Sequence, residues 1–354
     1  MKGLLLDQDK NLLEENRRLR SQIQKTYSFD NIIGISKPMR SIFAKIADVA
    51  ETDANILIQG EKGVGKEFIA RSLHANSLRK EGSFILVNCV DLPSSILEKE
   101  LFGYARGAFG AATQPKQGLL KHAHQGTVYL NEICDLDLSL QEKLVDVLKK
   151  RYYIPMGGTE KEFVDLRIIS STRHNPEKAM QNDTLRDNFY YRLNAVSIII
   201  PPLRDRKEDL PLLANHFLDK YCTRSNKDIM KLSSEAIACL MSYTWPGNVN
   251  ELQTLVERLV AVNNKALVRL KDLPKELQEN YELHNDILTA NLPLKDARKK
   301  WVAKFEKTYL LNLLAKCNGN ISKVARVAKV NRMTIYRMIN YYNITFSKSY
   351  FNRN

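Results

Sequence analysis

The segment that most constrains the fold is a glycine-rich run between an apolar stretch and a helix-forming stretch. The apolar stretch, residues 55–59, reads Asn-Ile-Leu-Ile-Gln. The run that follows it fits GxxxxGK and comprises Gly60, Glu61, Lys62, Gly63, Val64, Gly65, Lys66 and Glu67. Its glycines let backbone amides face phosphate oxygens, and Lys66 is placed to reach β- and γ-phosphates. The setting predicts a P-loop between a strand and a helix.

Apolar runs that alternate with helix-forming stretches predict a parallel α/β sheet over residues 29–202. The other four apolar runs are residues 84–87, 127–130, 166–170 and 196–200. After Pro201 and Pro202 the pattern is helical only, which predicts a helical subdomain over 203–280. The polar residues 281–295 are interpreted as a linker to a last domain, 296–354.

Residues 1–28 are predicted to form a helical linker. Leu5, Leu12 and Leu19 recur every seven residues, which is typical of a short coiled coil. Three heptads are marginal alone, so a plain amphipathic helix remains an alternative.

The positive charge of the chain is concentrated at its C-terminal end. The chain has a net charge of +14, and residues 296–354 hold 13 Lys or Arg against Asp296 and Glu306, a net +11. A short basic domain on a nearly neutral body predicts binding to double-stranded DNA, and a solubilising tail is the alternative.

Within this basic segment, residues 319–329 and 332–340 are predicted to form a helix-turn-helix, with Ala325, Ala328, Ile335 and Ile339 packing the two helices together. The second helix would be the recognition helix. A helical hairpin that only dimerises is the alternative. The predicted DNA-contacting residues are Arg332, Thr334, Tyr336 and Arg337.

Composition excludes several classes of protein. The five cysteines are scattered without a CxxC pair, which favours reduced thiols over disulfides or a zinc site. The sequence contains no run of about 18 apolar residues, and its first residues become acidic too soon to suggest a signal peptide. We therefore expect a cytoplasmic location and no membrane partner.

Several further segments resemble the bacterial enhancer-binding proteins, the sigma-54-dependent activators. In family order, the matching segments are residues 32–36, 60–67, 101–103, 107–109, 189–194, 202–206 and 245–249. The resemblance implies an AAA+ P-loop sheet with a helical lid, followed by a Fis-type helix-turn-helix. It also implies bound ATP or ADP with magnesium, a homo-oligomer between a dimer and a hexamer, a palindromic DNA site and RNA polymerase holoenzyme as a partner. The family usually has an N-terminal regulatory domain; this sequence either lacks one or is part of a longer protein.

Three positions depart from the family pattern in the nucleotide site. Asn131 stands where the family has the aspartate that helps to order magnesium, while the neighbouring Glu132, which would polarise water, is kept. Arg173 replaces a phosphate-sensing asparagine, and Asn250 replaces a lid arginine. Glu67 after the P-loop lysine is usual in the family. Arg186 and Arg192 match the arginine fingers that act on a neighbouring subunit.

A fourth departure lies in the loop that contacts sigma-54, which reads GAFTGA in the family. Here it comprises Gly107, Ala108, Phe109, Gly110, Ala111 and Ala112. The threonine hydroxyl and the second glycine are lost, which removes a gripping group and a flexible hinge.

Two interpretations of function remain open. One is a DNA-binding transcription regulator whose AAA+ domain binds ATP and oligomerises, hydrolyses ATP weakly or not at all, and does not depend on sigma-54. The other is an active hexameric ATPase that remodels sigma-54 RNA polymerase. A cyclic dinucleotide in the nucleotide region is a further alternative, although no residue demands it.

Overall fold

The computed structural model describes two compact units, which divide between Leu273 and Pro274. The described residues are 28–29, 32–110, 112–263, 265–279, 281, 293–317, 319–342 and 344. The predicted heptad helix and residues 282–292 of the predicted linker lie outside them.

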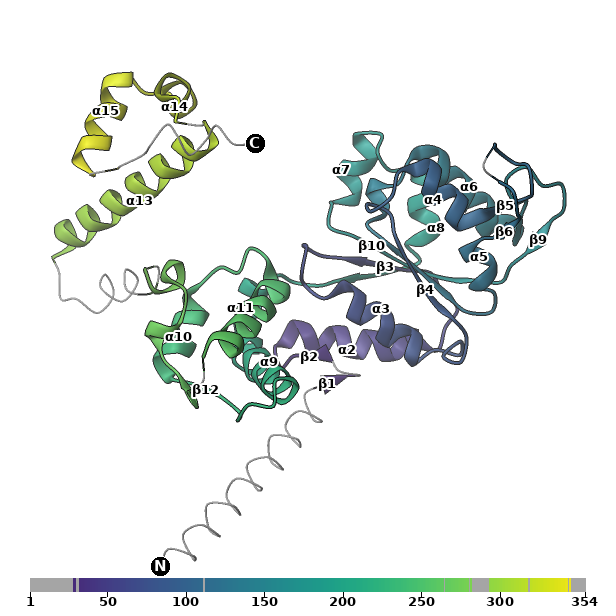
Figure 1. Cartoon of the computed structure of the whole chain (residues 1–354), viewed down its shortest axis with the longest axis horizontal. Helices are drawn as coiled ribbons and strands as arrows, with labels where there is room; N and C mark the ends of the chain where they lie inside the picture. The colour runs from purple at the N-terminus through teal and green to yellow at the C-terminus, as the bar shows by residue number, and fades with distance from the viewer. Residues whose placement is uncertain are drawn as a thin grey trace, which may run out of the picture. The chain divides into compact units, whose positions relative to one another are not determined.

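A five-stranded parallel sheet forms the centre of the first unit (Figure 1). Its order is β11-β3-β10-β7-β4, so the P-loop strand β3 lies next to the last strand and not at an edge. The strands are β3 (Ile56–Gln59), β4 (Phe84–Asn88), β7 (Thr127–Asn131), β10 (Arg167–Thr172) and β11 (Val196–Ile199). The five predicted strands are confirmed, with small differences at their ends.

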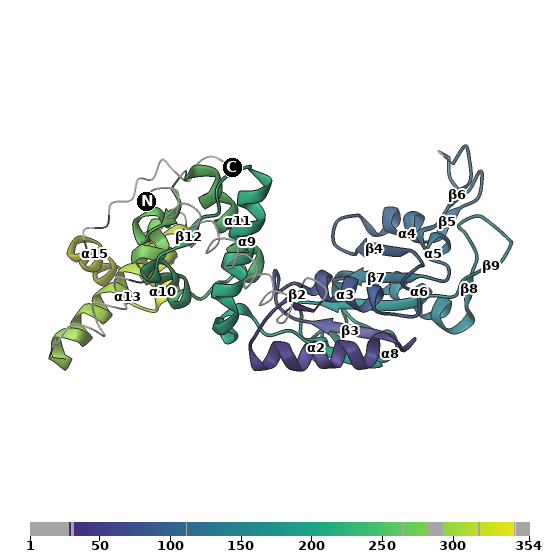
Figure 2. The same cartoon turned by 90° about the horizontal axis from the view of Figure 1, so that it is seen from below.

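Helices cover both faces of the sheet because its side chains alternate (Figures 1 and 2). Ile56 and Ile58 face α2 and α3, whereas Leu57 and Leu130 join the core under α4, α6 and α8. This three-layer arrangement is the predicted α/β class. The helices are α2 (Lys37–Ala50), α3 (Lys66–Ala75), α4 (Ser94–Phe102), α5 (Leu119–His122), α6 (Leu138–Lys150), α7 (Pro176–Gln181) and α8 (Asp187–Leu193).

The lid of the first unit is helical with one addition that the sequence analysis missed. Its helices are α9 (Leu210–Arg224), α10 (Ser234–Ser242) and α11 (Asn248–Val262). The parallel strands β12 (Lys231–Leu232) and β13 (Leu267–Val268) pair beside them. The prediction of helix alone is therefore wrong here, because a two-residue strand is too short to give an alternating pattern.

Short elements complete the first unit. The antiparallel pairs are β1 (Ser28–Phe29) with β2 (Ile32–Ile33), β5 (Gly103–Tyr104) with β6 (Lys116–Gln117), and β8 (Tyr152–Tyr153) with β9 (Glu162–Phe163). The 3-10 helices are η1 (Ile133–Asp135), η2 (Leu203–Asp205), η3 (Lys207–Asp209) and η4 (Leu270–Asp272).

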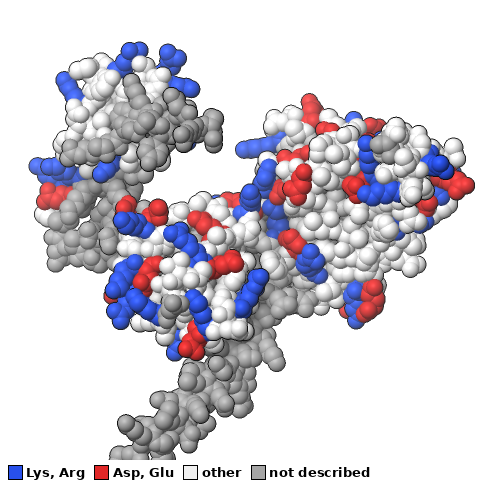
Figure 3. Space-filling model, in the orientation of Figure 1, with Lys and Arg blue, Asp and Glu red and all other residues white. Residues whose placement is uncertain are grey.

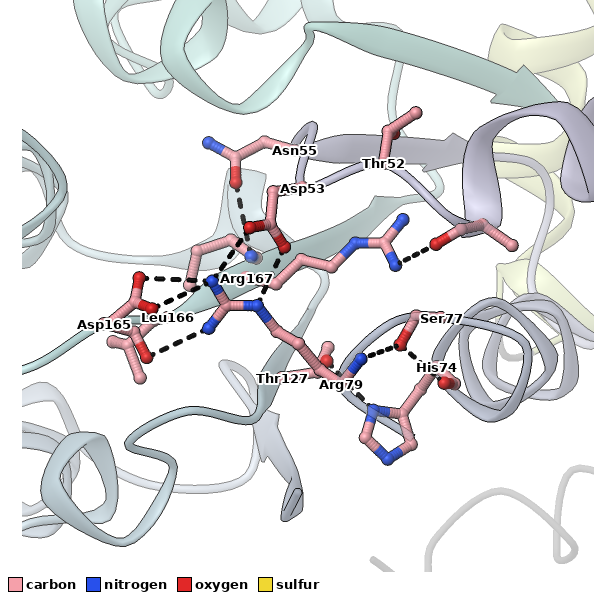
Figure 4. Close-up of polar contacts among 12 residues, drawn as sticks. Thr52, Asp53, Asn55, His74, Ser77, Arg79, Thr127, Asp165, Leu166 and Arg167 are labelled. Atoms are coloured by element: carbon pink, nitrogen blue, oxygen red, sulfur yellow. Dashed lines mark hydrogen bonds and ion pairs between the residues drawn. The ribbon is translucent and has the colours of Figure 1, made fainter. Parts of the chain in front are cut away.

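A polar network ties the starts of the strands together at the edge of the sheet remote from the P-loop (Figure 4). Arg79 donates from Nε to Asp53 at 2.8 Å and from Nη2 to Asp165 at 3.1 Å. The hydrogen bond from Arg79 lowers the pKa of Asp53. Buried Arg167 donates to the carbonyl oxygens of Val49 and Ala50. These bonds join α2, the segment after α3 and β10.

The second unit is a three-helix domain built from α13 (Leu294–Lys316), α14 (Ile321–Ala328) and α15 (Arg332–Tyr341). The predicted contacts are confirmed, since Ala325, Ile335 and Ile339 are buried in one core and Ala328 packs against it. The side-chain oxygen of Asn320 caps α14, and that of Asn331 caps α15. Both caps satisfy a backbone N–H that the helix leaves free.

The sequence analysis also expected reduced thiols and no membrane-spanning segment. The five cysteines all lie within the described residues, are buried and form no disulfide. Over the described ranges, no helix is long and apolar enough to cross a membrane.

The turn between α14 and α15 depends on an unfavourable backbone angle at Lys329. Its φ is +53°, and its N–H closes α14 by donating to Ala325 and Arg326. A side chain in this left-handed conformation costs about 1 kcal/mol relative to glycine. We therefore expect Lys329→Gly to stabilise the second unit by about 1 kcal/mol, measured as about fivefold slower hydrogen exchange of the buried α14 and α15 amides.

Arg326→Gly is the matched control, because it removes the same charge from a right-handed position inside α14. It should destabilise the unit by about 1 kcal/mol. If the α14 and α15 amides exchange faster in both variants than in the native chain, the backbone conformation of Lys329 does not destabilise the unit.

Candidate functional site

The loop between β3 and α3 has the backbone that the glycine pattern predicts. Gly63 and Gly65 have φ of +80° and +103°. A Cβ atom on Gly63 would lie 2.3 Å from the carbonyl oxygen of Gly247, in the lid. Gly63 is thus needed for its own conformation and for the close approach of the lid.

Lys66, the first residue of α3, is held inside the protein. Its ammonium donates to the carbonyl oxygens of Gly60 at 2.8 Å and Glu61 at 3.3 Å. Its third contact is an ion pair with Glu132, with 2.9 Å between Nζ and Oε1 and both side chains under 10% exposed. These contacts match the three donors of an ammonium, so a phosphate must displace at least one of them.

Glu132 follows β7 and is oriented from two sides. Oε1 contacts Lys66, and Oε2 accepts from the backbone N–H of Arg173 at 2.8 Å. Glu132 also has a left-handed φ of +63°, a costly conformation for a residue with a side chain. The strand ends of β7 and β10 therefore fix the predicted water-polarising carboxylate beside the P-loop.

The side chain of Asn131 lies in a polar chain across the strand ends. Its Oδ1 accepts from the hydroxyl of Ser171 at 2.8 Å and lies 3.3 Å from that of Tyr129. Its Nδ2 donates to Oδ1 of Asn88 at 3.2 Å. Asn88, which the sequence analysis missed, ends β4 and pairs in register with Asn131.

These residues line one open cleft of about 310 Å³. Of the predicted nucleotide-site residues, the structure brings most to this cleft, including Asn131, Glu132 and Arg173 from the strand ends and Asn250 from the lid. Lys62 of the P-loop run also lines it, and so do five residues that were not predicted, namely Phe68, Asn88, Val90, Asp91 and Tyr129. The sequence could have indicated several of them by their position, because they stand at or just after the carboxyl ends of β4 and β7, where ligands bind in parallel sheets.

A second, apolar hollow of about 300 Å³ adjoins the cleft, with Gly65 and Phe68 in both linings. Of the predicted site residues, Val64 contributes to it along with Gly65. Buried Arg206 closes it by donating to the carbonyl oxygen of Val64 at 2.9 Å, and burial lowers the pKa of its guanidinium. The sequence did not predict this hollow, because β2, α3 and the lid each supply part of it. A polar cleft beside an apolar hollow suits a ligand with a phosphate part and a flat base.

The lid is fastened to the P-loop through Glu61. Its carboxylate accepts two hydrogen bonds from Arg204, at 2.6 and 2.9 Å, and one from Asn248 at 3.2 Å. These bonds, that of Arg204 first, lower the pKa of Glu61. Asn248 also donates to the carbonyl oxygen of Lys62. Glu61 thus acts between the P-loop and the lid, a role that the motif alone does not give.

The two other altered positions contact the cleft differently. The guanidinium of Arg173 is turned to Asp135 at 3.2 Å and to His174 at 3.2 Å. Asn250 lies at the start of α11, and its backbone N–H donates to Gly63 at 3.2 Å. Glu67 lines the cleft and pairs with Arg71 one turn along α3.

The two predicted arginine fingers lie outside the cleft of their own chain. Arg186 precedes α8, donates to the carbonyl oxygen of Leu138 and pairs with Glu142 at 3.4 Å. Arg192, in the last turn of α8, donates to the carbonyl oxygen of Leu148. Both are exposed.

In the loop that follows β5, the side chain of Phe109 lies against neighbouring residues of the first unit. Gly107 and Ala112 share a backbone hydrogen bond, and Ala112 is buried. The ring of Phe109 lies edge-on to Tyr104 at 4.9 Å, with the ammonium of Lys99 3.9 Å from its centre. Phe109 is thus half-buried and not extended from the loop. Gly110 and Ala108 are described, and Ala111 lies outside the described residues.

The predicted DNA-contacting residues share the exposed side of α15. Arg332, Thr334, Tyr336 and Arg337 are all exposed, while Ile335 and Ile339 of the same helix are buried. Figure 3 shows Lys and Arg side chains on the described surface of the second unit. The arrangement leaves the N-terminal turns of α15 free for a partner.

The sheet order, the P-loop and the residues at the strand ends define a P-loop NTPase fold of the AAA+ class. Three family models match in succession. The sigma-54 interaction domain matches residues 32–199, the AAA+ ATPase lid domain 204–288 and the Fis family of bacterial regulatory proteins 302–342.

The chain is similar to known bacterial regulatory proteins. It is 36% identical to the regulatory protein AtoC of Escherichia coli over 331 residues, which is 94% of this chain and 72% of AtoC. It is 42% identical to the Nif-specific regulatory protein of Herbaspirillum seropedicae, of which it spans only 47%. The crystal structure of NtrX from Brucella abortus in complex with ATP matches with a TM-score of 0.67 and 32% identity, over 95% of this chain and 75% of that one. The chain therefore belongs to the sigma-54-dependent activator family.

The Lys66–Glu132 ion pair generates a prediction about ligand affinity. In Glu132→Gln the ammonium keeps its two carbonyl acceptors but loses its counter-charge, so a phosphate becomes the only anion available to it. We expect ATP to bind at least about tenfold more tightly, a difference of about 1.4 kcal/mol. Isothermal titration calorimetry measures it.

Glu67→Gln is the control, because it removes the same charge from the same cleft but breaks the ion pair with Arg71 and not the one with Lys66. Its affinity for ATP should stay within about twofold of the native value. Equal tightening in both variants would mean that only the overall charge of the cleft matters.

Proposed function

We propose that the chain is a sequence-specific DNA-binding transcription regulator whose AAA+ unit binds ATP or ADP, hydrolyses ATP slowly, and acts without sigma-54. The observation that carries the proposal is the contrast within one cleft. The P-loop and Glu132 are complete, whereas positions 131, 173 and 250 have lost the groups that the family places there.

Nucleotide binding is supported by the adjoining linings. The polar cleft offers Lys66 and the loop amides for phosphates, and the apolar hollow offers Phe68 and Leu213 for a base. Relatives bind such ligands, since NtrX from Brucella abortus has been solved in complex with ADP and with ATP. A cyclic dinucleotide is an alternative ligand to include in the binding assay.

Slow hydrolysis is supported by what the altered side chains do instead. The guanidinium of Arg173 is engaged with Asp135 and His174, so it does not present an amide to water. The side chain of Asn250 is uncharged and shorter than that of arginine, so it cannot replace the contact of a lid arginine with a phosphate. Asn131 brings no charge to a magnesium ion.

Independence from sigma-54 is supported by the loop at 107–112. Phe109 is held by Tyr104 and Lys99, and the loop lacks the threonine hydroxyl and the second glycine of the family motif. The partner that remains is RNA polymerase holoenzyme with another sigma factor, or DNA alone.

Pairing of two copies on a palindromic site is supported by α13. Trp301, Phe305 and Tyr309 follow one another at intervals of four residues and are 57%, 58% and 41% exposed. Two-fold symmetric DNA requires a two-fold symmetric protein, so a second copy of this chain is the partner that such an aromatic face would take.

An active sigma-54 ATPase is the second candidate. It is favoured by family membership, by the intact Glu132 and by the exposure of Arg186 just before α8 and of Arg192 in its last turn, where a neighbouring subunit could reach them. Higher assemblies up to a hexamer belong to this candidate.

Steady-state ATP turnover distinguishes the two candidates. We expect the purified chain, with or without DNA, to bind ATP but to turn it over about a hundredfold more slowly than a family member with aspartate, asparagine and arginine at the three positions. Loss of one group that stabilises transition-state charge costs about that factor. Comparable turnover, together with sigma-54 elements in its target promoters, would favour the second candidate.

DNA recognition is tested by replacing Arg332 and Arg337 with alanine. A target sequence is first selected from a random DNA library with the native chain. We expect the double variant to lose the footprint, because each base contact of an arginine contributes about 1–3 kcal/mol. Lys316→Ala, an exposed basic residue of α13, is the control and should keep the footprint. A footprint that survives in the double variant would contradict the assignment of α15.

A further inference from the structure

We propose that Asp91 is the carboxylate that holds the divalent cation of the bound nucleotide, in place of the aspartate that the family carries at position 131. The proposal rests on the proposed nucleotide binding and concerns the cation alone, not hydrolysis. Asp91 belongs to none of the motifs that the sequence analysis used.

Asp91 reaches the cleft because of the strand order. β4 and β7 are neighbours, with Asn88 and Asn131 paired in register at their carboxyl ends. The chain leaves β4 at Asn88, and three residues later Asp91 lines the same cleft as Lys66 and Glu132. A carboxylate that is lost at the end of β7, at position 131, can thus be replaced by the carboxylate of Asp91, which follows the end of β4.

The hydrogen bonds across these strand ends separate the roles of the two side chains. Asn131 uses Oδ1 to accept from the hydroxyl of Ser171 at 2.8 Å, and the hydroxyl of Tyr129, which donates to Ser171 at 2.9 Å, lies 3.3 Å from the same oxygen. Its Nδ2 faces Asn88, whose own Nδ2 donates to Oδ2 of Asp91 at 2.5 Å. Asn131 therefore positions Asn88, and Asn88 orients Asp91. The other oxygen of Asp91 accepts no hydrogen bond from any described residue.

Charge balance singles out the same residue. Three acidic side chains line the cleft, namely Glu67, Asp91 and Glu132. Glu132 is paired with Lys66, and Glu67 with Arg71. Within the described part of the chain, Asp91 is the acidic residue of the cleft without a cationic partner. It is also exposed to the cleft and free of a desolvation penalty, as a cation ligand should be.

The donor set fits the ion. Magnesium prefers oxygen ligands and is usually held by one or two carboxylates together with phosphate oxygens and waters. When bound, it would neutralise part of the phosphate charge. Asp91 supplies a carboxylate, while Glu132 stays available for the role that its bond to the Arg173 amide fixes.

The test compares binding of ADP with and without magnesium, so that hydrolysis does not enter. For the native chain we expect magnesium to tighten ADP binding about tenfold or more by calorimetry. In Asp91→Asn this gain should vanish, while the affinity in the presence of EDTA stays within about twofold of the native value. Manganese bound with ADP, detected by electron paramagnetic resonance, should be lost in parallel.

Two further variants sharpen the result. Glu51→Gln should keep the magnesium gain, because Glu51 is an exposed acidic residue at the end of α2 and does not line the cleft. In the double variant Asp91→Asn, Asn131→Asp, a carboxylate returns to the end of β7, and the gain should return. Equal thermal stability of all variants establishes that they fold alike.

The outcomes are distinguishable. If Asp91→Asn weakens ADP binding equally with and without magnesium, Asp91 only supports Asn88 and the proposal is overturned. An undiminished magnesium gain also overturns it while leaving nucleotide binding intact. If the native chain does not bind ADP, either with magnesium or with EDTA, the proposed nucleotide binding itself fails, and the cation site fails with it.

Discussion

The buried ion pair between Lys66 and Glu132 is the interaction on which the rest of the site depends. It joins the start of α3 to the end of β7, and so fixes the P-loop relative to the sheet. Removing two charges from water is costly, and here the cost is offset because every polar atom has a partner, including the amide of Arg173 on Glu132. A bound phosphate would take the place of the Glu132 carboxylate beside Lys66, so that ligand binding exchanges one anionic partner of Lys66 for another.

The same loop also carries the contact with the lid. Gly63 has no side chain where Gly247 approaches, and Glu61 is bonded by Arg204 and Asn248. A ligand that moves Lys66 therefore acts on residues three and five positions away that hold the lid. The bonds from Arg204 and Asn248 to Glu61 thus join the P-loop to the lid in a chain that has Asn250, and not an arginine, at position 250. Under the proposed function, these lid contacts respond to a bound nucleotide, and the three altered positions slow its hydrolysis.

Much of this was accessible from the sequence, and what was missed has physical reasons. The five strands followed from β-branched runs, and the helix-turn-helix core from the spacing of Ala325, Ile335 and Ile339. The β12–β13 pair was missed because two residues carry no period. Asp91 and the apolar hollow were missed because both depend on which strands are neighbours, a property of the sheet order and not of any local pattern. The folded position of Phe109 depends on Lys99 and Tyr104, which no motif includes.

The central claim is that positions 131, 173 and 250, and not the P-loop, limit hydrolysis. The most direct measurement is single-turnover ATP hydrolysis by the triple variant Asn131→Asp, Arg173→Asn, Asn250→Arg beside the native chain, both saturated with ATP and magnesium. The account predicts that the triple variant hydrolyses ATP at least about a hundredfold faster, with ATP affinity changed far less. Equal rates in the two proteins, whether both fast or both slow, would contradict it.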